Sequence, residues 1–122
     1  MKIKLDEFTR QYIETALWAS DDDADIPLDE NYKISDLSEE ALEEAIADCK
    51  KFQEQFAELL ARAGNDSQNG HDFWLTRNQH GAGFWDRGYD EDVSDGLKDA
   101  CHWQGEFGEC CLYVGDDGKI YF

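Results

Sequence analysis

"HDFWLTRNQHGAGFWDRG" occupies residues 71–88 and holds two Trp, two Phe and two His in eighteen positions. Within it, Phe73 and Leu75 alternate with Trp74, as residues on the two faces of a β-strand do. Phe84 follows after a polar, glycine-containing segment that suits a turn. We therefore expect a β-hairpin over 71–88, with Phe73, Leu75 and Phe84 in the core.

Two helices are expected before this hairpin. Residues 5–20 and 38–64 carry apolar side chains at intervals of three and four, the spacing of one helix face. Ser38 is a suitable N-cap for the second helix, and Gly64 is a suitable residue for its end.

The C-terminal part predicts a short helix and a second hairpin. Residues 90–104 are acidic with a helical pattern, and the strands 109–114 and 119–122 are separated by the turn sequence GDDG. The 122 residues are enough for one domain. We expect a single α+β domain over 1–122, in which two N-terminal helices pack on a small antiparallel sheet of two hairpins with a short intervening helix.

The most unusual property of the composition is its charge. Asp and Glu number 29 against 11 Lys and Arg, which gives a net charge of −18. This charge opposes direct binding to nucleic acid or to an anionic membrane, and it favours a basic protein surface as partner. No apolar run is long enough to cross a membrane, and the N-terminus lacks a signal-peptide pattern, so we expect a cytoplasmic protein.

Two acidic segments are the candidate partner-binding surface. The first lies in the loop after the first helix, and the second lies at the start of the short third helix. Their members are Asp21, Asp22, Asp23, Asp25, Asp29, Glu30, Asp90, Glu91, Asp92 and Asp95.

The expected hairpin over 71–88 also carries polar and aromatic residues that could serve either folding or binding. Asp72 with Arg87, and Arg77 with Asp86, are plausible cross-strand ion pairs. Each buried Trp would need a partner for its indole N–H. The complete set of candidates is His71, Asp72, Trp74, Arg77, His80, Trp85, Asp86 and Arg87.

No pattern in the sequence indicates catalysis, a metal or a cofactor. The Cys and His spacings match no known ligand set, and phosphate-binding and dinucleotide-binding motifs are missing. Cys101 and His102 are adjacent in sequence, which is not how a nucleophile and its base usually meet. We expect no metal, no cofactor and no enzymatic activity.

The central motif, with "ALWAS", "LDENY" and "LYVGDDGKIY", resembles a family of small acidic proteins of bacteriophages and prophages. The resemblance covers nearly the whole chain and implies a protein made inside an infected bacterium. It departs from the family at Gln79, where Gly is commoner. Together with the charge, it favours an inhibitor of a host nucleic-acid-binding defence system, of anti-CRISPR or antirestriction type, that acts by DNA mimicry or by blocking a basic groove. A phage accessory protein with another partner and a small enzyme using the hairpin are the alternatives.

Overall fold

The computed structural model describes residues 5–22, 24–78, 83–84, 87–101, 107 and 110–122. The described part of the chain is mainly helical, so the expected α+β class is wrong. It contains the α-helices α1 (Glu7–Ala19), α2 (Glu39–Gln55), α3 (Ala57–Ala61), α4 (Asp66–Arg77) and α5 (Glu91–Ala100), the short 3-10 helices η1 (Leu28–Glu30) and η2 (Ile34–Asp36), and the strands β1 (Tyr113–Val114) and β2 (Ile120–Tyr121).

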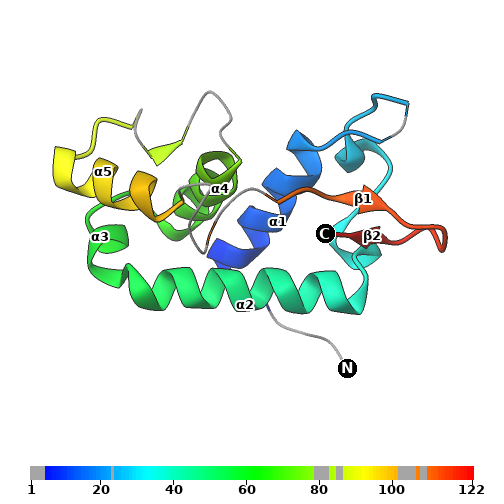
Figure 1. Cartoon of the computed structure of the whole chain (residues 1–122), viewed down its shortest axis with the longest axis horizontal. Coiled ribbons are helices and arrows are strands. Elements are labelled where there is room, and N and C mark those ends of the chain that lie inside the picture. The colour runs from blue at the N-terminus through cyan, green and yellow to red at the C-terminus, as the bar shows by residue number, and fades with distance from the viewer. Residues whose placement is uncertain (1–4, 23, 79–82, 85–86, 102–106, 108–109) are drawn as a thin grey trace.

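Helix α2 forms the long lower side of the molecule in Figure 1. Helices α1 and α4 lie above its centre, α3 and α5 lie at the left end, and the β1–β2 hairpin lies with η1 at the right end. The backbone N–H of Ser38 donates to the carbonyl of Ile120 at 2.8 Å. This bond ties the hairpin to the start of α2.

Side-chain caps explain where the two N-terminal helices begin. The Asp6 carboxylate accepts a bond from the backbone N–H of Thr9 at 2.8 Å, and the Ser38 hydroxyl accepts one from Ala41 at 3.0 Å. Both bonds satisfy N–H groups that a helix start leaves unpaired. The second helix is shorter than expected, because Phe56, with φ −118° and ψ 27°, separates α2 from α3.

The hairpin expected over 71–88 is wrong, because residues up to Arg77 belong to α4. Asn65 caps this helix by accepting from the backbone N–H of Gln68 at 2.8 Å, and Asp66 follows in the first turn, where it suits the helix dipole. Every residue from 72 to 77 is buried. This second half of α4 is buried on all sides and has no polar face, so the periodicity that identifies a helix is lost there.

The core is built around stacked aromatic rings. Phe73 of α4 lies parallel to Phe52 of α2, with ring centroids 4.1 Å apart, and Phe107 meets both rings edge-on. Phe73, Leu75 and Phe84 are all buried, which confirms the expected core residues, although Phe73 and Leu75 lie on helix α4 and Phe84 lies after it.

The C-terminal hairpin is confirmed only in a reduced form. Tyr113 pairs with Tyr121 and Val114 with Ile120, so each strand has two residues instead of the expected 109–114 and 119–122. Gly118 adopts φ +79° in the turn, a conformation that glycine reaches without strain. This hairpin is too small to form the sheet on which the helices were expected to pack.

Candidate functional site

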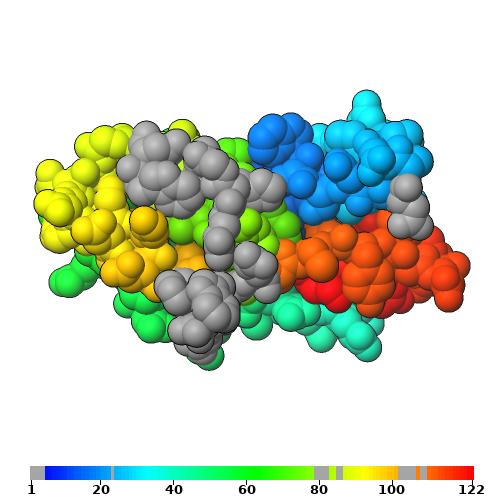
Figure 2. Space-filling view, turned by 45° about the horizontal axis from the view of Figure 1, so that its top comes forward, coloured from blue at the N-terminus to red at the C-terminus, as the bar shows by residue number. Residues whose placement is uncertain are grey.

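The two acidic segments predicted from the sequence lie at opposite ends of the molecule. The loop after α1 lies at the right end of Figures 1 and 2, and α5 lies at the left end. The structure therefore does not join the two segments into one continuous surface.

The segment after α1 is partly used by the fold itself. The Asp22 carboxylate accepts bonds from the backbone N–H groups of Ala24 and Ile26 at 2.8 and 3.0 Å, so it holds a turn. The remaining described members of this segment are exposed: Asp21, Asp25, Asp29 and Glu30. Asp23 lies outside the described residues.

The segment at the start of α5 is partly neutralised. Arg62 donates to both carboxylate oxygens of Asp92, at 2.7 and 3.0 Å, and reaches Asp90 at 3.4 Å. The bond from Arg62 lowers the pKa of the Asp92 carboxyl below its usual value. Glu91 and Asp95 remain exposed beside this pair.

Sequence reasoning missed a further acidic surface on α2. Ala41, Ala45, Cys49 and Phe52 turn one side of α2 into the core, which leaves the other side to water. We define the α2 acidic face as the four exposed residues at its N-terminal end: Glu39, Glu40, Glu43 and Glu44. The helical pattern could have revealed them, because charges fill the positions that the apolar stripe leaves.

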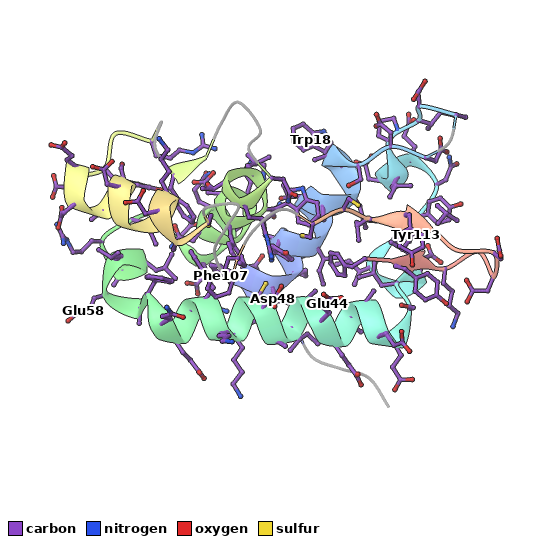
Figure 3. All side chains as sticks on the ribbon, in the orientation of Figure 1. Trp18, Glu44, Asp48, Glu58, Phe107 and Tyr113 are labelled. Carbon is purple, nitrogen blue, oxygen red and sulfur yellow. The ribbon has the colours of Figure 1, made fainter. Side chains whose placement is uncertain are left out.

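No salt bridge among the described residues neutralises the α2 acidic face. It continues onto the C-terminal hairpin through Tyr121, whose hydroxyl donates to Asp117 at 2.6 Å. That bond, with the charges of Asp117 and Glu40, raises the pKa of Tyr121. Lys50 and Lys51 follow later on α2, so the acidic face is limited to its first half. Oxygen- and nitrogen-tipped side chains project from the lower edge of α2 in Figure 3.

Asp72 and Arg87 form the ion pair that the sequence predicted, between α4 and the loop before α5. Arg87 donates to both Asp72 oxygens, with the shortest bond at 2.7 Å, and Gln68 donates a further bond at 3.1 Å. Asp72 is fully buried. The pair fixes the loop to α4, which is a structural task.

Arg77 makes a buried contact that the sequence did not predict. Its guanidinium donates to the Tyr12 hydroxyl at 2.9 Å and to the Asp48 carboxylate at 3.0 Å. Burial would lower the pKa of Arg77, but Tyr12, Cys110 and Asp48 around it raise that pKa overall. Asp86, the expected partner, lies outside the described residues together with His80 and Trp85.

A cleft of about 570 Å³ lies between the end of α1 and the segment before β1. Trp74, Cys110 and Cys111 contribute to its lining. The indole N–H of Trp74 is buried and has no partner among the described residues. Burial raises the pKa of the Cys110 thiol, and it raises that of Cys101 to about 12, so both are protonated at neutral pH. Protonated thiols are poor nucleophiles and poor metal ligands.

The sequence predicts no metal site and no membrane span, and the structure bears on both predictions only over the residues that it describes. No group of three or more His, Cys, Asp or Glu side chains suited to a metal occurs there. His71 and Asp72 point to different partners, Thr15 and Arg87. Among the described helices, none has the length and apolarity that a membrane span requires.

Comparison with protein-family models, curated proteins and solved structures finds no match to this chain. The resemblance to phage proteins and the function that it implies therefore stay predictions, and the functional argument rests on the surface chemistry of the chain.

Proposed function

We propose that this protein binds a basic protein surface through the α2 acidic face and thereby blocks a nucleic-acid-binding defence protein in the cytoplasm of a bacterial host. The observation that carries the proposal is the run of exposed carboxylates on the first half of α2, which form no salt bridge with any residue that the structure describes. They stand on a rigid helix whose opposite side is anchored in the aromatic core.

These carboxylates offer a nucleic-acid-binding groove the kind of anionic oxygen that it binds, at a wider spacing than the phosphates of DNA. Residues four apart on a helix lie about 6 Å apart along its axis, so Glu39 and Glu43 form one row and Glu40 and Glu44 form another. Duplex DNA presents about one charge per 3.4 Å along each strand. The Lys and Arg side chains of such a groove are flexible enough to bind either the carboxylates of α2 or the phosphates of DNA, since both present anionic oxygens.

The charge of the whole chain supports the same partner. With a net charge of −18, the protein attracts a basic surface over long distances and repels nucleic acid. Its electric field therefore favours encounters with basic proteins. The association should weaken as salt rises, because exposed charges are screened beyond about 8 Å at physiological ionic strength.

A competition assay tests the proposal. The protein is titrated into reactions in which purified restriction endonucleases or CRISPR nucleases cleave a labelled DNA duplex. We expect inhibition of a susceptible enzyme that is relieved by excess duplex DNA. Inhibition that excess DNA does not relieve would contradict binding in the DNA groove, and unchanged cleavage by all enzymes of both classes would contradict the inhibitor function.

A further inference from the structure

The groove between α1 and α4 holds a polar site that is independent of the acidic surface. Gln11 lines it from α1, and Ser67 and His71 line it from α4, while the buried Thr15 contacts His71 from behind the cleft. The Ser67 hydroxyl donates to Gln11 Oε1 at 3.2 Å, and Thr15 Oγ1 lies 2.8 Å from His71 Nδ1. A cleft of about 360 Å³ opens there, lined also by Asn65 and Gln68.

Hydrogen bonds fix the protonation pattern of His71. The Thr15 hydroxyl donates its single hydrogen to the carbonyl of Gln11 at 2.8 Å, so Thr15 Oγ1 must accept from His71 Nδ1–H. Burial, with a smaller contribution from the charge of Arg87, outweighs the opposing charge of Asp72 and lowers the pKa of His71 below its ordinary value, which favours the neutral ring at pH 7. Nε2 therefore carries a lone pair, and it has no partner among the described residues.

The other polar groups of the cleft are fixed in the same way. Asn65 Oδ1 accepts from the backbone of Gln68, which leaves the Asn65 amide N–H groups as donors. Gln68 Nε2 donates to Asp72, which leaves Gln68 Oε1 as an acceptor. The cleft thus offers donors and acceptors together, and a hydroxyl group, which is both, satisfies such a mixture.

An exposed aromatic ring stands beside this cleft. Trp18, one turn after Thr15 on α1, is 57% exposed, and its ring centroid lies 6.2 Å from that of His71. Figure 3 shows Trp18 at the outer end of α1. An indole ring left in water presents a large apolar face that a ligand can cover.

We propose that Trp18 and the cleft beside His71 bind a neutral sugar. A pyranose ring has an apolar C–H face that stacks on indole and a rim of hydroxyls that bonds to amide and imidazole groups. None of the described residues that line the cleft carries a charged side chain, in a chain of which 33% is charged, so this lining offers no counter-charge to an anionic or a cationic ligand. The overall negative charge further disfavours phosphorylated ligands, nucleotides included.

Protein-observed NMR with a defined set of sugars tests this proposal. Methyl β-glucoside, methyl β-galactoside and methyl N-acetyl-β-glucosaminide are titrated into ¹⁵N-labelled protein, with glucose 6-phosphate as the charged comparison. We expect at least one neutral glycoside to shift the amide signals of residues 11–18 and 65–71 with millimolar affinity. The charged sugar should bind more weakly. No shifts with any glycoside, or equal shifts with glucose 6-phosphate, would overturn the proposal.

Matched variants locate the site. Trp18→Ala should weaken glycoside binding by about tenfold or more, which corresponds to about 1.4 kcal/mol. Ser67→Ala should weaken it by a smaller factor. Tyr113→Ala is the control, because Tyr113 is also an exposed aromatic residue, 53% exposed, and it stacks on Tyr121 in the C-terminal hairpin. Binding that is lost in Tyr113→Ala and kept in Trp18→Ala would contradict the assignment.

Discussion

Gly70 decides how closely α1 and α4 pack, and replacing it with Ala should destabilise the protein. A Cβ atom at this position would lie 2.1 Å from the carbonyl oxygen of Phe8, whereas ordinary contact begins at 3.4 Å. The two helices would have to separate by about 1.3 Å to accept one methyl group. The neighbour is backbone, so no side-chain rotation can relieve the clash.

The size of the effect follows from two opposing contributions. Overpacking costs about 1–3 kcal/mol, and Phe8 would also draw away from Phe52 and Phe73, whose rings lie 6.2 and 5.9 Å from its own. The higher helix propensity of Ala compared with Gly offsets up to about 1 kcal/mol of this cost. We expect Gly70→Ala to lower the free energy of unfolding by about 2 kcal/mol and the melting temperature by roughly 6–10 °C.

Gly96→Ala in α5 is the matched control. Its Cβ would lie 2.7 Å from the Cδ1 atom of Leu59, and the other Leu59 atoms lie at 3.9 Å, so this side chain can move aside. The gain in helix propensity should then leave stability unchanged or raise it by up to about 1 kcal/mol. Urea denaturation followed by circular dichroism measures both variants. If Gly70→Ala is no less stable than Gly96→Ala, the close packing of α1 on α4 is wrong.

Four further predictions follow from the packing, the charge and the thiols. Phe73→Ala should cost about 3–5 kcal/mol of stability in thermal melts, because it removes the central ring of the core. The melting temperature should rise from very low to physiological salt, because salt screens repulsion within a chain of net charge −18. Burial tends to raise the pKa of Asp6, but the hydrogen bonds from Thr9 and Gln53 outweigh it and lower that pKa. The stability that Asp6 contributes is therefore present above its unfolded-state pKa and is lost as the pH falls through its folded-state pKa. Asp6→Asn should accordingly lose less stability than the parent in acid denaturation. A thiol reagent should modify the exposed Cys111 rapidly and the buried Cys49 and Cys101 only on unfolding.

Local signals explain why α1, the start of α2 and the final turn could be predicted. Asp6 and Ser38 cap helices that have one apolar and one polar side, and the GDDG segment places glycine where the turn needs a positive φ. In these segments, sequence neighbours determine the structure, so a short window of sequence is sufficient.

The motif over 71–88 could not be placed correctly because its environment is set by distant residues. Arg77 is buried beside apolar residues, and a local stretch of sequence gives no sign that the distant Asp48 neutralises it. Gly70 has a low helix propensity, whereas the close contact of α4 with Phe8 requires glycine there. The local signal for the start of this helix is its N-cap, Asn65.

For the candidate sites too, local sequence reveals some features, and others depend on contacts between distant residues. Acidic composition directed attention to carboxylates, but the clusters in consecutive sequence positions lie at opposite ends of the molecule. The α2 acidic face is spread over two turns of a helix and becomes visible only after the apolar stripe is assigned to the core. The Trp18–His71 contact joins positions 53 apart and needed the packing of α1 on α4.

The affinity of two charge-matched variants for an inhibited DNA nuclease tests the central claim most directly. One variant carries Glu40→Gln, Glu43→Gln and Glu44→Gln on the α2 acidic face. The other carries Glu91→Gln, Asp95→Asn and Asp99→Asn on α5, and all six positions are exposed. Isothermal titration at low salt should show at least about tenfold weaker binding for the α2 variant and near-parent binding for the α5 variant. Equal affinities for the two variants would show that only net charge matters, and a loss confined to the α5 variant would place the contact at the other end; either result would contradict binding through α2.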